Sequence, residues 1–398
     1  MTEATTSQSK AARLDLVDAL RGFALLGLFL VHCVELFELY WAHPVDGPVF
    51  DWVFGLFAGK SYALFALCFG LSFFLIMDGA ARRGVDFRGR FAWRLILLLV
   101  IGILHGLIYR GDILQILALL GLAMLLFDRI RDNRLLILLS ILCFLQIPLF
   151  VRAWAAAHGF DWAAQTPLFM HDDTLPALTV GSLGDVLRVN LVDGQLAKWS
   201  YYAATGRLTQ MLGLFMLGLA LGRTGFFLAP ERYLVTRRIL LAVAAGIAAQ
   251  LWFEGPDFLD LLTPGGSPAR PYLGWAFDCW TNLAILTVEV CLFIELYETA
   301  ARPLLRSLAA PGRMTLTLYV GQSLVFVPIF YGFGLGLHDD LTLAQSLWIG
   351  IIAFPAQIAF AHFWFRHFHY GPLEWLWRAA TRTTLDIPFR RRPAAVRA

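Results

Sequence analysis

Histidine and aspartate side chains recur inside apolar stretches of this chain, where polar groups are costly. His32 lies in the first apolar run, His43 follows it by eleven residues, and His105 and Asp112 flank a short turn between two later runs. An ionisable group at mid-bilayer costs roughly 2.5–3.5 kcal/mol on insertion scales, so each of these residues is a functional candidate. Imidazole has a pKa of about 6.5 and exchanges protons at neutral pH. The pattern predicts proton-transfer chemistry in a membrane cavity.

Each of these side chains also has a structural alternative. His32 lies about 21 Å along a helix from Asp18, and a hydrogen-bonded core histidine is its alternative role. His43 would lie about 16 Å beyond His32, and Pro44 indicates that the helix is ending. The two imidazoles therefore share a reacting atom only if the segment folds back. Asp112 follows a glycine and begins an apolar run, so helix capping and orienting a histidine stay equally open.

Other polar groups lie within or at the ends of apolar runs. Asp18 and Arg21 are three residues apart on one helical face, which predicts an ion pair. Gly102 and Gly106 form a small-xxx-small pair that lets another element approach closely beside His105. The remaining in-membrane polar candidates are Gln115, Asp278, Glu289 and Gln322.

The composition shows which elements must position these groups. Of the 398 residues, 59% are hydrophobic and 15% are charged, with mean hydropathy +0.66, whereas soluble domains have about 25% charged residues. This excludes an ordinary soluble enzyme. Apolar runs repeatedly approach the roughly 20 residues that cross a bilayer as a helix. We predict an all-α polytopic membrane protein with about ten spans, at 16–40, 61–79, 93–109, 112–127, 135–152, 208–224, 236–253, 272–296, 314–333 and 343–365.

The basic residues predict the orientation. Connections on one side hold 24 Lys and Arg and those on the other side hold 7, with Arg21 inside the first span. The positive-inside rule then places both termini in the cytoplasm, and His43 and the 109–112 turn outside. We expect a single transmembrane domain with two five-span halves, 1–152 and 208–398. Residues 153–207 are expected to lie along the outer interface as short amphipathic pieces, and residues 50–58 to be interfacial or re-entrant.

Several classes of site are not indicated. The five cysteines lie inside apolar segments without paired spacing, so that neither a disulfide framework nor a zinc site is expected, and we expect no metal. The arginines form no basic face, which argues against nucleic-acid binding. Phosphate-loop, dinucleotide-binding, HExxH and GxSxG motifs are missing from the sequence.

Five segments carry a resemblance to a known family. They are LDLVDALRGFALLGLFLVH, FAGKSYALFALCFGLSF, RGDILQILALLGL, GRMTLTLYVGQS and FHYGPLEWLWR. In this order they resemble the YeiB-like family of bacterial membrane proteins. The first span also resembles bacterial O-acyltransferases, which have a catalytic histidine where His32 stands. It further resembles heparan-α-glucosaminide N-acetyltransferase, which has asparagine there and its catalytic histidine at the position of His43. Two departures are His32, where YeiB-like proteins commonly have asparagine, and Leu318, where asparagine is usual.

The resemblance implies a transmembrane acyltransferase in the bacterial inner membrane. Acetyl-CoA or another acyl-CoA would be the donor. The acceptor would be a hydroxyl or amine on the outer side, in a small molecule, a glycan or a lipid-linked compound. Besides the bilayer, a homodimer partner stays open. The alternative is a transporter or exporter of a small or lipidic metabolite, for which Glu289 and Asp278 would serve proton coupling.

The same resemblance suggests roles for individual residues. His43 is our first choice for general base or transient acyl carrier, and His32 is the second. His105, Asp112 and Gln115 would orient the site. The donor's phosphates would bind the guanidinium groups near the cytoplasmic side, those of Arg21, Arg94 and Arg313.

Overall fold

The computed structural model describes residues 2–170 and 173–391, with side chains from residue 15 onward. Regular structure in these ranges is helical, apart from an isolated bridge between Phe368 and Arg390. The first half consists of α1 (Thr2–Val34), η1 (Leu36–Ala42), α2 (Pro48–Leu56), α3 (Ser61–Ala81), α4 (Arg88–Gly106), α5 (Leu114–Phe127), α6 (Asn133–Phe144) and α7 (Ile147–Ala157). The predicted all-α class is confirmed.

Short helices follow in the segment expected to lie along the outer interface. They are α8 (Asp161–Ala164), η2 (Leu168–Met170), α9 (Leu175–Thr179), α10 (Leu183–Leu191) and α11 (Asp193–Ala204). The rest of the chain forms α12 (Arg207–Thr224), η3 (Pro230–Tyr233), α13 (Leu234–Phe253), α14 (Gly255–Leu262), η4 (Pro264–Gly266), α15 (Arg270–Tyr297), α16 (Arg302–Arg306), α17 (Ala309–Arg313), α18 (Thr315–Phe330), α19 (Leu343–His367) and α20 (Pro372–Arg382).

Seven stretches of the described chain are long and apolar enough to cross a bilayer. They are 15–42, 48–81, 88–106, 133–157, 230–253, 270–297 and 343–367. Two bent helix pairs, α11 with α12 and α16–α17 with α18, raise the number to nine if each pair is one span. The shorter apolar helix α5 falls on the remaining predicted span. The chain is therefore a polytopic membrane protein, and the count of ten spans stays a prediction.

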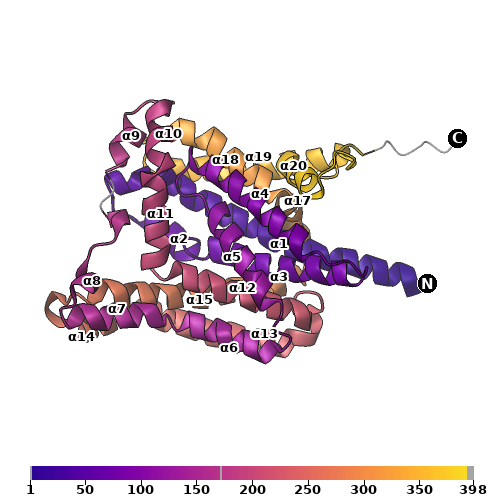
Figure 1. The fold of residues 1–398 in the computed structure, drawn as a ribbon, viewed down its shortest axis with the longest axis horizontal. Coiled ribbons are helices and arrows are strands. Elements are labelled where there is room, and N and C mark those ends of the chain that lie inside the picture. Colours follow the sequence, from indigo (N-terminus) through magenta and orange to yellow (C-terminus); the bar gives the residue numbers. More distant parts are fainter. Residues whose placement is uncertain (1, 171–172, 392–398) are drawn as a thin grey trace.

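Helix α1 lies in the centre of the molecule and packs against α3, α17, α18 and α19 (Figure 1). It is apolar on several sides, as expected of a helix surrounded by protein, and Leu20, Ala24 and Leu25 are fully buried. α12 packs against α3 and α6, whereas α13 and α7 both pack against α15. The cysteines of the described chain are free, and four of the five are buried as small core residues.

Glycine makes the closest of these contacts possible. A Cβ atom on Gly312 of α17 would collide with the backbone carbonyl of Asp18 in α1, and one on Gly22 would collide with the carbonyl of Leu308. Small residues of this kind let membrane helices approach at backbone distance. These contacts hold the middle of α1 directly against α17 and the residue before it.

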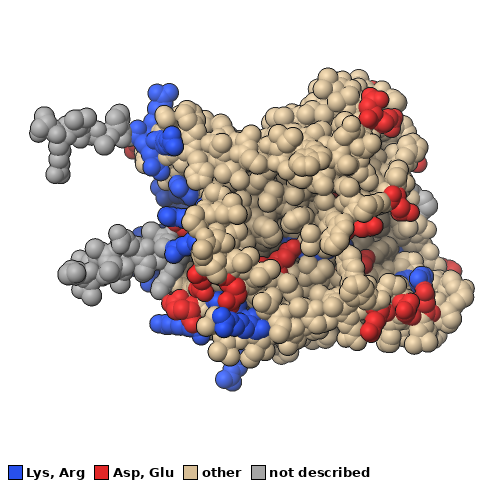
Figure 2. Space-filling view, turned by 180° about the vertical axis from the view of Figure 1, so that it is seen from behind, with Lys and Arg blue, Asp and Glu red and all other residues tan. Residues whose placement is uncertain are grey.

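Charge is distributed unevenly along the molecule. The beginning of α1 and helix α20 lie at the same end (Figure 1), and lysines and arginines gather at that end (Figure 2). Asp18 and Arg21 of α1 form the predicted ion pair, at 2.9 Å. The positive-inside rule expects this arrangement of a cytoplasmic face, so the opposite end is the predicted outer end.

Candidate functional site

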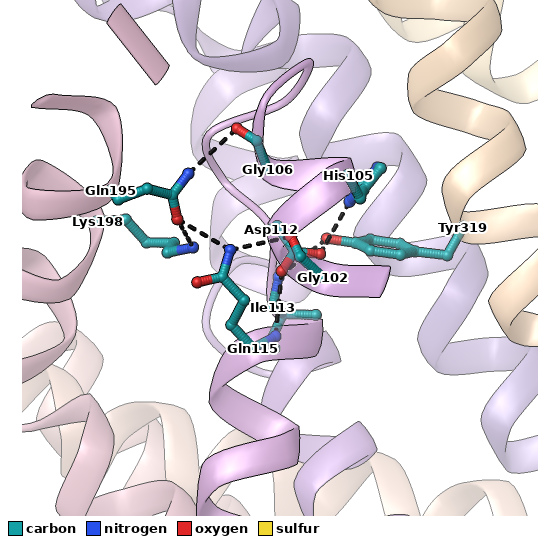
Figure 3. A network of polar contacts seen from close by, with 9 residues as sticks. All are labelled: Gly102, His105, Gly106, Asp112, Ile113, Gln115, Gln195, Lys198 and Tyr319. Atoms are coloured by element: carbon teal, nitrogen blue, oxygen red, sulfur yellow. Dashed lines mark hydrogen bonds and ion pairs between the residues drawn. The ribbon is translucent and has the colours of Figure 1, made fainter. Parts of the chain in front are cut away.

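A buried histidine–aspartate pair lies at the turn between α4 and α5 (Figure 3). His105 Nδ1 lies 2.8 Å from Asp112 Oδ1, and the two side chains are 1% and 0% exposed. When Nδ1 of a neutral imidazole donates to a carboxylate, Nε2 keeps its lone pair. Nε2 is buried and has no hydrogen-bond partner among the described residues. The pair thus presents one oriented, unused proton acceptor.

Asp112 has both of the roles that the sequence left open. Its Oδ1 orients His105, while its Oδ2 accepts a hydrogen bond from the backbone N–H of Gln115, 3.1 Å away, in the first turn of α5. One carboxylate therefore joins the end of α4 to the beginning of α5. The position of the imidazole depends on this turn.

An amide network lies beside the pair, on the side of α11 (Figure 3). Gln115 Nε2 donates to Gly102 O and to Gln195 Oε1, both at 2.9 Å, and Gln195 Oε1 also accepts from Lys198 Nζ at 2.7 Å. Gln195 Nε2 donates to Gly106 O at 3.2 Å. A Cβ on Gly102 would lie within 3 Å of the Gln115 backbone N and Asp112 Oδ2, and one on Gly106 within 3 Å of the Gln115 and Gln195 side-chain amides. The predicted small-residue pair thus makes room for polar groups of α5 and α11.

Two tyrosine rings connect His105 with His32. The His32 ring centroid lies 5.0 Å from that of Tyr109 and 6.2 Å from that of Tyr319, and the His105 centroid lies 6.0 and 5.1 Å from the same rings. His32 Nδ1 is buried without a partner among the described residues. His32 therefore does not fit the alternative of a fully hydrogen-bonded core histidine. Burial raises the pKa of Tyr109 well above its ordinary value, so this phenol stays neutral.

The backbone next to this site is strained. Leu36, Phe37 and Glu38 have φ values of 51°, 51° and 80°, in the left-handed region that costs about 1–3 kcal/mol for each non-glycine residue. Arg110 holds this segment, because its Nε pairs with Glu38 Oε2 and its Nη1 donates to Thr174 Oγ1 at 2.6 Å. Strain of this kind persists where surrounding contacts over-determine the backbone, often at functional sites.

The structure separates His43 from the other histidines. His43 is exposed just after η1, and its backbone N–H donates to Tyr40 O at 3.2 Å. Among the described contacts, no hydrogen bond, ion pair or ring contact joins its side chain to His32 or His105. The described contacts therefore do not form an imidazole site shared by His43 and His32.

The three predicted donor-binding arginines lie on α1, α4 and α17, in different settings. Arg21 pairs with Asp18 and contacts Ser72 Oγ, and the Arg94 guanidinium lies 3.6 Å from the Trp377 ring centroid. Arg313 lies over the Phe365 ring at 4.1 Å and lines a cavity of about 780 Å³. The cavity's other basic residues are Arg302, Arg306 and His362.

The remaining sequence candidates lie away from the His105–Asp112 pair. Gln322 Nε2 donates to Gln357 Oε1 at 2.8 Å. Asp278 and Glu289 both face Lys60, a buried lysine at the start of α3. Sequence reasoning did not select Lys60, Gln195, Lys198 or Tyr319; the lysines carried a signal, because each is a lone charge beside an apolar run.

Glu374 of the C-terminal motif joins α20 to α18. The spacing of Glu374 and Arg378 suggests a solvated ion pair on α20. Instead, Glu374 accepts hydrogen bonds from Thr317 N at 3.0 Å and from Thr317 Oγ1 at 2.6 Å, at the beginning of α18. Arg378 lies over the Tyr370 ring. The free N–H groups at a helix start explain the choice, since they attract a carboxylate.

Two family models match different parts of the chain. Residues 13–173, which include His32, His105 and Asp112, match the family model "Heparan-alpha-glucosaminide N-acetyltransferase, catalytic". Residues 221–384 match "Protein of unknown function (DUF418)". The chain is 29% identical to "Uncharacterized protein YxaH" of Bacillus subtilis (strain 168), over 93% of this chain and 94% of the relative. It is 26% identical to "Uncharacterized protein YeiB" of Escherichia coli (strain K12), over 92% and 95%. The predicted resemblance to the YeiB-like family is confirmed.

The YeiB-like resemblance spans both halves of the chain, whereas the acetyltransferase resemblance covers only the half with the histidine–aspartate pair. This N-terminal part is similar to the catalytic region of a transmembrane acetyltransferase family. The candidate site therefore lies in the part of the chain where that similarity is found.

Proposed function

We propose that the protein is a membrane-embedded acyltransferase that uses the His105–Asp112 pair as its general base. The observation that supports this assignment most directly is the buried, unpartnered Nε2 of His105 opposite a carboxylate-bound Nδ1. A base oriented by a third group is the arrangement that activates a weak nucleophile. This proposal gives His105 the role that sequence reasoning assigned first to His43 and then to His32.

The reaction would be acyl transfer from a thioester to a hydroxyl or amine. Nε2 of His105 accepts the proton of the acceptor as its oxygen or nitrogen attacks the thioester carbonyl carbon. The C–S bond then breaks, and the departing thiolate receives that proton from the imidazolium. Asp112 stabilises the transient imidazolium by the hydrogen bond to Nδ1. His32 lies beside the same tyrosines and would contact the substrate.

The cavity at the end where α1 begins suits the donor. Its arginines would bind phosphates, since guanidinium groups match phosphate oxygens in geometry and charge. Asp15, which lines this cavity, precedes His32 by 17 residues along α1, a rise of about 25 Å. A separation of this size favours a donor with a long arm between its phosphates and its thioester. Acetyl-CoA or another acyl-CoA has this form.

The test is acyl transfer or donor hydrolysis by the purified protein. Millimolar acetyl-CoA should also raise the melting temperature, because a ligand that binds only the folded state stabilises it. Wild-type rates from the His105→Gln and Asp112→Asn proteins would overturn the proposed mechanism. The exposed Asp46→Asn substitution is the matched control, since it removes one outer carboxylate away from the pair.

A transporter is the second candidate function, and the bent helix pairs favour it. α11 meets α12 at 69° and α17 meets α18 at 80°, and many transporters bind substrates at such broken helices. A protein that shows neither acyl transfer nor a melting-temperature shift with acetyl-CoA, yet moves a solute across vesicles, would be a transporter.

A further inference from the structure

The break between α11 and α12 exposes a helix N-terminus inside the protein. The two helices meet at 69° around Gly206, whose φ of 74° lies in the left-handed region that favours glycine. The N–H groups of the first turn of α12 have no preceding helical carbonyls to bind. Gly206 provides no side-chain cap for them. The beginning of α12 therefore carries the partial positive charge of a helix N-terminus.

Arg207, the first residue of α12, adds a full positive charge, and two of its three guanidinium nitrogens lack a hydrogen-bond partner among the described residues. Arg207 is only 9% exposed, and its Nε and Nη1 atoms are both buried without a hydrogen-bond partner among the described residues. Arginine has five N–H donors and cannot shed its charge. A buried charge without a counterion is strongly unfavourable. We therefore expect these N–H groups to bind an anionic hydrogen-bond acceptor.

No described residue forms an ion pair with Arg207 or accepts a hydrogen bond from its Nε or Nη1. The guanidinium carbon lies 5.8 Å from the ring centroid of Tyr62, whose hydroxyl is also buried and unpartnered. Tyr201, Cys279 and the exposed carboxylate of Asp278 also face Arg207, but none of the described residues forms an ion pair with it. The other nearby cation is Lys60, and the carboxylates that face Lys60 are Asp278 and Glu289.

We propose that the break between α11 and α12 binds an oxyanion, a carboxylate or phosphate group of the acceptor. The guanidinium of Arg207, the hydroxyl of Tyr62 and the free N–H groups at the start of α12 are its donors. A helix N-terminus beside an arginine is a recurrent arrangement for binding such groups. That the ligand is the acyl acceptor rests on the proposed function. That an anion binds here rests on Arg207 itself.

Helix α11 connects this site to the His105–Asp112 pair. Lys198 of α11 belongs to the amide network beside Asp112, while Tyr202, one turn later, lies 5.9 Å from the Tyr62 ring. Lys198 and the break at Thr205 are therefore roughly 10 Å apart along α11. An acceptor held by its anionic group at the break could extend a hydroxyl or amine toward His105. The acceptor class is thus a hydroxyl or amine compound that carries an oxyanion, either soluble or as a phospholipid headgroup.

The experiment measures anion binding by the full-length protein through its melting temperature. Inorganic phosphate and acetate are titrated against chloride at constant ionic strength, and nanodiscs with phosphatidylglycerol are compared with pure phosphatidylcholine. We expect at least one of these anions to raise the wild-type melting temperature. Arg207→Gln should weaken that binding by about tenfold or more, and Arg207→Lys should restore part of it. A response to phosphate or acetate indicates a soluble acceptor, whereas a response to phosphatidylglycerol alone indicates a headgroup.

Two further variants separate a binding role from a structural one. Tyr62→Phe deletes only an unpartnered hydroxyl and should weaken binding about fivefold. Arg188→Gln removes the same charge from an exposed site on α10 and should leave binding unchanged. Without anion, Arg207→Gln should melt no lower than wild type, because it removes an unpaired buried charge. Absence of any anion response in wild type, or an equal response in wild type and Arg207→Gln, would overturn the inference.

Failure of the proposed function gives a different result. His105→Gln should abolish acyl transfer while keeping the anion response. Anion binding without acyl transfer in wild type would refute the acyltransferase alone, and acyl transfer without an anion response would refute this site alone.

Discussion

His105 and Asp112 lie seven residues apart in the chain, and their side chains meet at 2.8 Å across the turn that joins α4 to α5. The same carboxylate holds the first turn of α5 through the N–H of Gln115. The orientation of the His105 imidazole and the local folding of α5 therefore depend on a single side chain. A substitution at Asp112 should affect both.

Replacing Asp112 by asparagine tests this coupling. Asparagine can accept or donate at Nδ1, so it no longer selects the tautomer with a free Nε2. We expect the acyl-transfer rate to fall about 10²- to 10⁴-fold. Steady-state rates of Asp112→Asn and of the exposed control Asp46→Asn provide the comparison. Equal rates in the two variants would contradict the role of Asp112.

Substituting each histidine separately tests which imidazole reacts. His105→Ala should lose about 10²- to 10⁴-fold in rate, whereas His43→Ala should stay close to wild type, since His43 is exposed and away from the pair. Rates of the purified variants decide between them. A loss at His43 equal to that at His105 would favour His43 as the general base, the first choice from the sequence. The loop that carries His43 would then close over the substrate.

Arg313→Gln tests the donor cavity. Loss of one charge-assisted contact to a phosphate should raise KM for acyl-CoA about tenfold and leave kcat nearly unchanged, because Arg313 lies far from the reacting atoms. The matched control is Arg90→Gln, at an exposed position in the first turn of α4. An unchanged KM in Arg313→Gln would place the donor elsewhere.

Gly312→Ala tests the contact between α1 and α17. The added methyl group would collide with the carbonyl of Asp18, and overpacking of this kind lowers the free energy of unfolding by about 1–3 kcal/mol. Gly321 of α18 has open space around its Cβ position, so Gly321→Ala should be neutral or stabilising. Melting temperatures of the two variants should therefore move in different directions or by clearly different amounts.

Glu374 predicts a pH dependence of stability. Burial raises the pKa of this carboxyl above its ordinary value of 4.5, although two hydrogen bonds from Thr317 partly oppose the shift. The folded state then binds the proton more tightly than the unfolded state, so the wild type loses stability as pH rises from 4.5 through the raised pKa. Glu374→Gln has no such proton. As pH rises from 4, the melting temperature of Glu374→Gln should increase relative to that of the wild type. A constant difference between the two melting temperatures would contradict the raised pKa.

Much of the architecture could be predicted from the sequence, because span length and charge distribution are local properties of the chain. Each predicted span falls on an apolar helix or bent pair, and the basic end of the molecule is the one where α1 begins. The proximity of His105 and Asp112 was also foreseeable, since a short turn keeps residues seven apart within reach. Asp18 and Arg21 met for a similar reason, one helical turn apart.

Contacts between distant segments were decided only by the tertiary structure. Whether His32 or His43 joins His105 depends on how the chain continues after α1, and the strained residues Leu36, Phe37 and Glu38 set that path. The unpartnered Arg207 became visible only once α3, α11 and α15 were placed around it. Hydropathy determines that a residue is buried, but packing determines which partners it finds there. For a polar group inside a membrane protein, those partners distinguish a structural residue from a site.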